Sequence, residues 1–127
     1  MRIDRDPALI AYQLADECRA LVTATAKPAQ LDTAEAVRDV AEGLHLAAGL
    51  LPQAVRQAAA ALRALEEQQA LGVAGGGDAG EAVSLVLRAF LNAEVGLTVA
   101  RAALREACEP LSRLGGEVVA GGGGSSV

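Results

Sequence analysis

Apolar residues recur every seven positions through the C-terminal part of the chain, and this repeat constrains the fold more than any other feature. Two rows three residues apart form the seam of a helix that packs against another helix. We therefore expect a helix over about 79–114, roughly 54 Å long at 1.5 Å per residue. The first row is Val83, Phe90, Leu97, Leu104 and Leu111, and the second is Val86, Ala93, Ala100, Ala107 and Leu114.

A second segment has the same period, and its phase continues through Gly49 and Pro52. A proline inside a helix costs about 3 kcal/mol, because one backbone hydrogen bond is lost and the ring crowds the preceding turn. We expect one helix over about 33–71 that is kinked near 49–52, and a break at Pro52 is the alternative. The two rows are Val37, Leu44, Leu51, Ala58 and Leu65, and Val40, Ala47, Ala54 and Ala61.

Capping signals bound these segments. Asp32–Glu35 (DTAE) and Asp78–Glu81 (DAGE) have the spacing of capping boxes, which open helices. Between the two long segments, the glycine-rich stretch 71–77 (LGVAGGG) predicts a flexible turn. Asp6-Pro7 is typical of a helix N-terminus and opens a shorter helix, expected at about 7–26.

These patterns predict an all-α fold. Two long helices joined by a short turn form a long antiparallel helical hairpin, and the shorter N-terminal helix packs on it. A break at Pro52 converts this arrangement into a three- to four-helix bundle. We expect residues 1–115 to form a single helical domain, and the Gly/Ser-rich residues 116–127 to form a flexible tail.

Composition and charge bound the function. The chain is 52% hydrophobic and only 2% aromatic, so Ala, Leu and Val supply the apolar content, which suits closely packed helices. The net charge of -5 argues against nucleic-acid binding, which needs a basic face. Charges interrupt the apolar segments, so we expect no membrane span and no signal peptide, and a cytoplasmic location. Abundant Arg, Ala and Gly suggest a GC-rich bacterial genome.

The two cysteines are far apart in the sequence and lack a CxxC spacing. We expect Cys18 and Cys108 to be reduced, buried side chains that act as small hydrophobic residues.

The stretch RDVAEGLH, residues 38–45, holds the one histidine of the chain. Glu42 and His45 have the Glu-x-x-His spacing found in carboxylate-bridged di-iron sites. Arg38 and His45 resemble the R-x4-6-H motif of HEPN-type ribonucleases, a resemblance that implies RNA cleavage by the two side chains across a dimer. In the predicted register all three lie outside the seam, so we expect a solvated helix face with no metal and no cofactor.

The overall plan, a small acidic Ala-rich hairpin with a Gly-rich end, resembles the type VII secretion substrates of the WXG100 family. That resemblance implies a helical hairpin dimer that a secretion ATPase recognises. The family's Trp-x-Gly turn is absent, because the chain contains no Trp. Its Tyr-x-x-x-Asp spacing occurs at Tyr12–Asp16, in the first helix instead of after the second.

The apolar stripes are longer than one short helix can cover, and residues suited to catalysis are few. We therefore expect a non-enzymatic protein–protein interaction module that dimerises or docks on a partner protein. The four-alanine run at 58–61 permits close contact on two sides of its helix. The residues expected at this interaction seam are Val83, Phe90, Leu97, Leu104, Leu111, Ala58, Leu62 and Leu65.

Overall fold

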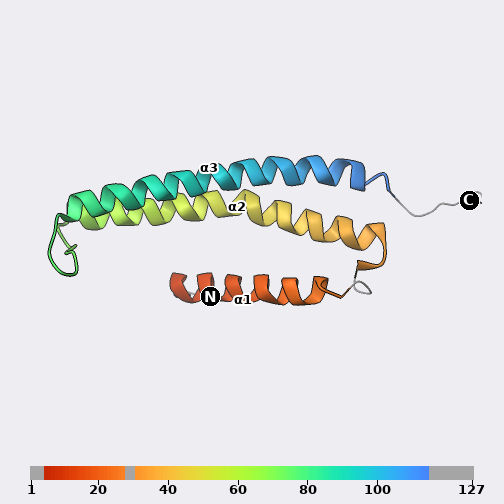
Figure 1. Cartoon of the computed structure of the whole chain (residues 1–127), viewed down its shortest axis with the longest axis horizontal. Helices are drawn as coiled ribbons and strands as arrows, with labels where there is room; N and C mark the ends of the chain where they lie inside the picture. The colour runs from red at the N-terminus through yellow and green to blue at the C-terminus, as the bar shows by residue number, and fades with distance from the viewer. Residues whose placement is uncertain (1–4, 28–30, 115–127) are drawn as a thin grey trace, which may run out of the picture. The chain divides into compact units, whose positions relative to one another are not determined.

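The structure is a computed structural model that describes residues 5–27 and 31–114 of the chain. Within these ranges it contains three α-helices and no β-strand (Figure 1). The helices are α1 (Pro7–Thr25), α2 (Ala34–Glu67) and α3 (Ala79–Leu111). The expected all-α fold is confirmed, and the predicted tail, 116–127, lies outside the described residues.

The chain divides into two compact units. Arg38–Arg113 form one unit, which holds most of α2 and all of α3, and α1 belongs to the other unit. The single domain expected over 1–115 and the packing of the N-terminal helix on the hairpin stay predictions.

α1 begins where the sequence predicts. Asp6 is its N-cap, and the Asp6 carboxylate accepts a hydrogen bond from the backbone N–H of Ala8 at 3.1 Å. Pro7 occupies the first helical position, where the missing N–H has no helical partner to lose. α1 ends at Thr25, one residue before the expected end.

The N-cap of α2 is Thr33, one residue later than the DTAE pattern predicts. The Thr33 hydroxyl accepts from the backbone N–H of Ala36 at 3.0 Å, and the Thr33 carbonyl accepts from Val37. The N-cap of α3 is Asp78, as predicted, and its carboxylate accepts from the backbone N–H of Gly80 at 3.0 Å. Both caps satisfy backbone donors that the first helical turn leaves unpaired.

α2 runs unbroken through Pro52. The break that would give a four-helix bundle is therefore not formed, and α2 bends gently near its middle (Figure 1). Pro52 and Ala48, four residues apart on one face, are both buried. Pro52 lacks the N–H that would bond to the Ala48 carbonyl, and its ring crowds that carbonyl, so a bend is expected at this turn.

α2 ends at Glu67, four residues earlier than expected, because Gln69 adopts a left-handed backbone with φ of 54°. The backbone N–H of Gln69 donates to the carbonyl of Glu66 at 2.9 Å, and that of Ala70 donates to Leu65 at 3.0 Å. This pair of bonds is the Schellman motif, usually built on glycine. The predicted glycines come later: Gly75, Gly76 and Gly77 all have positive φ and lead the chain into α3.

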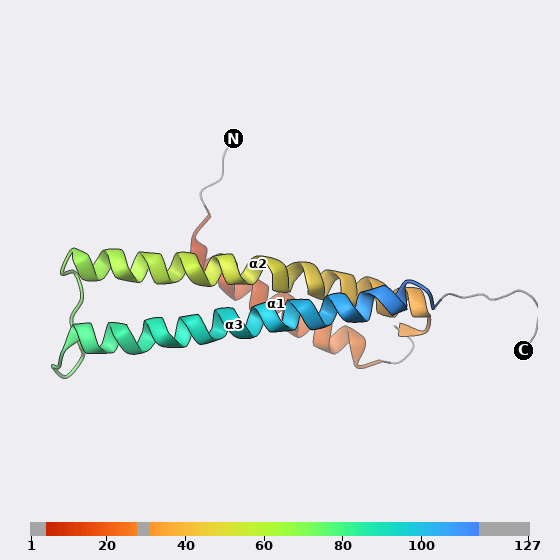
Figure 2. The same ribbon diagram turned by 90° about the horizontal axis from the view of Figure 1, so that it is seen from above.

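α2 and α3 lie side by side and antiparallel (Figures 1 and 2). His45 of α2 lies against Arg101 of α3, and further along α2, Arg56 pairs with Glu94. Residue numbers rise along α2 as those of its partners fall along α3, as an antiparallel hairpin requires. α3 ends at Leu111 instead of 114, where Pro110 occupies the last turn.

The first heptad row of α3 turns toward α2. Val83 is 5% exposed, and the other members of that row are half-buried: Phe90, Leu97, Leu104 and Leu111. The second row is different from the prediction. Leu87, Glu94 and Cys108 are half-buried, whereas the predicted positions Val86, Ala93, Ala100, Ala107 and Leu114 are exposed.

On α2 the rows that face α3 are shifted by one residue from the prediction. The positions that are buried or half-buried at seven-residue spacing are His45, Pro52, Ala59 and Glu66, with Ala48, Val55 and Leu62 between them. A one-residue shift turns the contacting face by about 100°. The observed row includes His45 and Glu66 where the predicted row has leucine, so the apolar pattern alone favours the register that the structure does not use.

Candidate functional site

His45 lies on the hairpin contact, whereas the predicted register placed it outside the seam. Its Nδ1 is 3.2 Å from the backbone carbonyl oxygen of Arg101, so the tautomer that is protonated at Nδ1 donates a hydrogen bond to α3. The ring is half-buried. The expected solvated face at 38–45 is therefore wrong for His45, because the true register of α2 brings this residue to the seam.

Glu42 and Arg38 differ in their surroundings. Glu42 is exposed, whereas Arg38 is half-buried like His45, and Arg38 Nε lies 3.9 Å from Asp39 Oδ1. In the part of the chain that the structure describes, no three side chains of His, Cys, Asp or Glu gather closely enough to hold a metal ion. The structure thus keeps Arg38 and His45 on one half-buried row of α2 and leaves Glu42 exposed to solvent.

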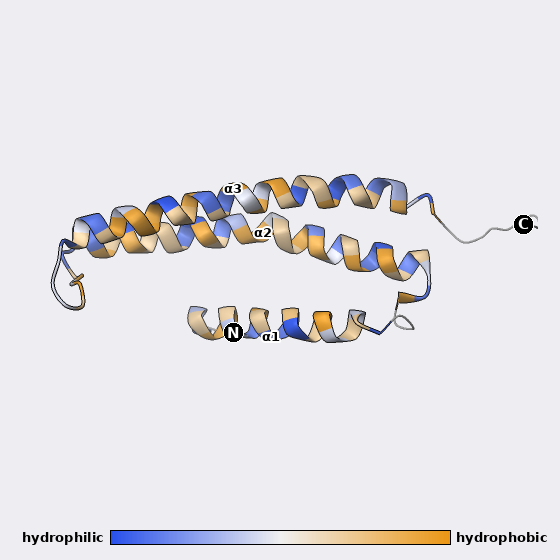
Figure 3. Ribbon diagram, in the orientation of Figure 1, coloured by the Kyte–Doolittle hydropathy of each residue, from blue (hydrophilic) through white to orange (hydrophobic). Residues whose placement is uncertain are grey.

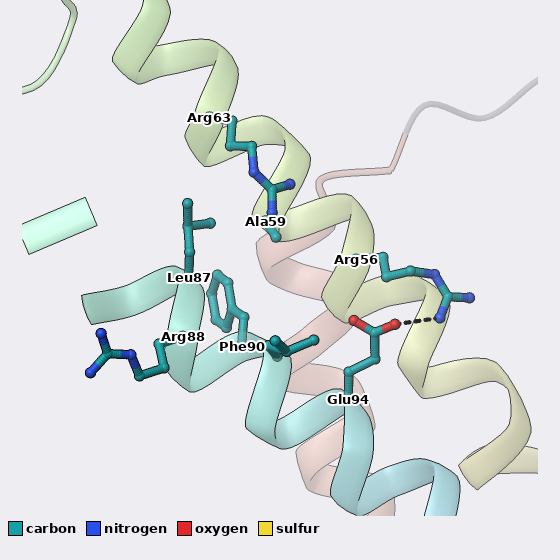
Figure 4. A pocket seen from close by; sticks show the side chains of 8 residues that line it. Arg56, Ala59, Arg63, Leu87, Arg88, Phe90 and Glu94 are labelled. Carbon is teal, nitrogen blue, oxygen red and sulfur yellow. Dashed lines mark hydrogen bonds and ion pairs between the residues drawn. The ribbon is translucent and has the colours of Figure 1, made fainter. Parts of the chain in front are cut away.

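A groove between α2 and α3 has a volume of about 630 Å³ (Figure 4). α2 contributes two arginines and a buried alanine, and α3 contributes apolar side chains, one arginine and one glutamate. The lining residues are Arg56, Ala59, Arg63, Leu87, Arg88, Phe90, Leu91 and Glu94.

An ion pair spans the groove. Arg56 Nη1 lies 2.7 Å from Glu94 Oε2, and Arg56 Nη2 donates to Gln53 Oε1 at 2.8 Å (Figure 4). The Arg56 side chain is 51% exposed and that of Glu94 is 23% exposed, so water screens the attraction. The pair therefore favours one register of α2 on α3 more than it adds stability.

Arg63 and Arg88 give the groove a local positive charge. No described carboxylate forms an ion pair with either side chain, whereas Glu94 is matched by Arg56. The groove floor includes the Phe90 ring. Guanidinium groups beside apolar side chains suit an acidic protein surface, although the groove is too open to exclude water from a reaction.

The far side of α3 is apolar and uncovered by α2. We call it the outward face, made of Leu85, Val95 and Val99, each more than half exposed. Apolar residues recur along the whole of α3 in Figure 3. α3 is also long and apolar enough to cross a membrane by length and composition alone, a weak indication that core helices share. Glu94 and Arg101 interrupt the apolar sequence of α3, and the expectation of no membrane span stays a prediction.

The predicted seam residues fall into two groups. Val83 and Leu62 line a smaller hollow of about 170 Å³ near the turn, while the larger groove involves Phe90. Ala58 and Leu65, in contrast, are exposed and take no part in lining either hollow. Their row is the one that the one-residue shift of α2 turns away from α3.

Three residues of the hairpin contact escaped the sequence argument. Arg56 and Arg63 are seven residues apart on α2. In the observed register this spacing places both arginines beside α3, and it is the one sequence signal that could have identified them. Gly49 permits a close approach, because a Cβ atom there would lie 3.1 Å from Arg101 Nε. Nothing in the sequence distinguishes this glycine from Gly43, which has open space around it.

The cysteines differ from the expected buried pair. Cys18 is exposed and Cys108 is half-buried, and both are free thiols.

Comparison with protein-family models, with curated proteins and with solved structures finds no significant match for this chain.

Proposed function

We propose that this chain is a non-enzymatic protein–protein interaction module that associates through the α2–α3 hairpin, with itself or with a partner protein. The supporting observation is the ratio of exposed to buried apolar side chains. Only Ala48, Ala59 and Val83 are buried hydrophobic residues among those described, whereas sixteen large hydrophobic side chains are exposed. A chain this size normally buries most of its apolar surface, so association supplies the missing cover.

The finer architecture belongs to the same proposal. The helix at Pro7–Thr25 packs on the hairpin and residues 1–115 form one domain, with a protein as the partner and neither nucleic acid, membrane nor cofactor involved. The exposed apolar residues of α1, among them Ile10 and Leu14, support a packed position for that helix. A cytoplasmic location and a bacterial source stay predictions.

Light scattering coupled to size exclusion, with circular dichroism of the same peak, tests this proposal on the full chain. We expect a strongly helical homodimer, or a weakly helical chain that becomes helical only when its partner is added. A strongly helical, thermally stable monomer that needs no partner would contradict the proposal, since such a chain has no uncovered surface to satisfy.

Two alternative functions rest on single features. A role as a type VII secretion substrate or partner is supported by the hairpin plan alone. An RNA-cleaving or metal-binding site at Arg38, Glu42 and His45 is supported by their spacing, while the contact of His45 with the Arg101 carbonyl argues for a structural role. His45→Ala separates these classes: loss of RNA cleavage or of bound metal with the assembly intact would establish the site.

A further inference from the structure

The outward face of α3 has an uncharged stretch with a charge at each end. Between Arg88 and Glu106 the charged residues are Glu94, Arg101 and Arg105. Glu94 and Arg101 contact α2, and Arg105 lies one turn after Arg101 on the same side. The outward side of this stretch is consequently apolar, with Val95 56% exposed and Val99 63% exposed at its middle.

The two end charges are opposite in sign and symmetric about Leu97. Arg88 lies nine residues before Leu97 and Glu106 nine residues after it. The eighteen residues that separate them make five full helical turns, so both side chains leave α3 on the same face. Neither forms an ion pair with another described residue.

A helix with this pattern is complementary to an antiparallel copy of itself. When a second α3 is turned end for end about Leu97, Arg88 of each copy meets Glu106 of the other. Val95 of each copy then lies beside Val99 of the other, as apolar positions do in antiparallel helix pairs. The same rotation brings Glu81 near Arg113, since 81 and 113 are each sixteen residues from 97.

Resting on the self-association proposed above, we propose that two copies of this chain pair through the outward faces of their α3 helices, antiparallel and centred on Leu97, with two Arg88–Glu106 ion pairs. The symmetric contact is closed, because each copy uses the same patch on both sides of the two-fold axis. Arg88 lines the α2–α3 groove and also ends the outward face, so the proposed contact reaches the Arg88 edge of the groove, while the lining residues of α2 stay outside it.

The charges favour a second copy over a lipid bilayer as the cover of this face. A membrane-spanning α3 would place Glu94 and Arg101 in the hydrocarbon region, where charged side chains are strongly disfavoured. When a second copy covers the face, Glu94 and Arg101 keep their contacts with α2. The charges of Arg88 and Glu106 are neutralised by the second copy. Flanking ion pairs around an apolar centre also fix the orientation of the pair, which lipid contacts do not.

Charge reversal tests the pairing in the full chain by sedimentation velocity across a dilution series. Arg88→Glu and Glu106→Arg each place two pairs of like charges in the dimer, and we expect each to weaken dimerisation by about tenfold. The double variant and an equimolar mixture of the two single variants both restore opposite charges, so both should dimerise like the wild type. Arg63→Glu makes the same charge change on α2 and should leave the dimer unchanged. Val95→Asp should abolish dimerisation without loss of helicity.

The outcomes separate this inference from the proposed function. If the wild type is a dimer and none of these variants weakens it, the chain self-associates but not through the proposed α3 contact. In a parallel pair residue 88 would meet residue 88 and residue 106 would meet residue 106, so each single variant would keep the like-charge pairs of the wild type. The mixture would then dimerise more tightly than the wild type, which distinguishes a parallel pair from the antiparallel one. A wild-type monomer overturns both the contact and self-association, and its flotation with phosphatidylcholine vesicles would assign the outward face to lipid.

Discussion

Arg56 of α2 and Glu94 of α3 form an ion pair with an N–O distance of 2.7 Å across 38 residues of sequence. The pair forms because the row of α2 that faces α3 is shifted by one residue from the predicted row. In the predicted register Arg56 would lie away from α3, and the half-buried Glu94 carboxylate would lose its partner. One long-range charge pair thus accompanies a register that differs from the one the apolar pattern favours.

The Arg56–Glu94 pair should couple the two helices weakly. Because both side chains are partly exposed, a double-mutant cycle of Arg56→Ala and Glu94→Ala should give a coupling free energy of about 0.5 to 1 kcal/mol. Urea denaturation at one fixed protein concentration measures it. The more exposed Arg113–Glu109 pair at the C-terminal end of α3 is the control and should give about 0.3 kcal/mol. A coupling near zero for Arg56–Glu94 would mean that the pair does not select the register.

Ala58 and Ala59 test the register directly, since they are neighbours with opposite environments. Ala59 is 8% exposed and lines the groove, whereas Ala58 is exposed. Ala59→Asp buries a charge at the helix contact and should lower the free energy of unfolding by more than about 3 kcal/mol. Ala58→Asp should cost only the difference in helix propensity, about 0.7 kcal/mol. Thermal and urea unfolding of both variants measure the contrast, and the reverse order would restore the register predicted from sequence.

Helix positions followed from the sequence because local signals determine them. Asp6 and Asp78 cap the N-termini of α1 and α3 by accepting hydrogen bonds from backbone N–H groups two residues further on, and Pro7 fixes the first helical position, so a sequence displays these signals directly. The register of α2 did not follow. Its two candidate rows both contain alanine and leucine, and the deciding contacts join residues such as Arg56 and Glu94 that only the fold brings together.

The same distinction explains the candidate site. The spacing of Glu42 and His45 is a local property, but the direction in which His45 points depends on the register of α2. An error of one residue therefore turned a hairpin contact into a predicted solvated face. The end of α2 failed for another reason: a left-handed conformation is expected at glycine, and the chain adopts it at Gln69 before the first glycine is reached.

Gln69→Gly should stabilise the protein. A left-handed backbone costs a non-glycine residue about 1 kcal/mol, and glycine adopts it without that cost. We expect the free energy of unfolding to rise by about 0.5 to 1 kcal/mol in urea denaturation. Gln68→Gly is the matched control, because residue 68 precedes the left-handed position and its N–H donates to the Ala64 carbonyl at 3.1 Å. Gln68→Gly should be neutral or destabilising. If it raised the free energy of unfolding as much as Gln69→Gly does, the stabilisation would not come from the Schellman motif.

Gly43→Ala and Gly49→Ala should both change the stability of α2, by different amounts. Alanine is favoured over glycine inside a helix by about 0.8 to 1 kcal/mol. Gly43 has open space around it and should yield the full gain. At Gly49 the new methyl group would meet Arg101 Nε at 3.1 Å, so the arginine must move and part of the gain is lost. Equal gains at the two sites would show that Arg101 does not rest on Gly49.

Pro52→Ala measures what the unbroken passage of α2 through proline costs. Alanine restores a backbone hydrogen bond to the Ala48 carbonyl, and the propensity difference alone is about 3 kcal/mol. Opposing this, the buried proline ring loses two methylene groups of contact at about 0.8 kcal/mol each. The helix effect is larger, so we expect a net stabilisation of about 1 to 2 kcal/mol and a straighter α2. Urea denaturation at a fixed protein concentration measures the change in the free energy of unfolding. A crystal structure of the variant shows whether α2 is straighter. A net destabilisation would mean that packing of the ring between the helices outweighs its cost to α2.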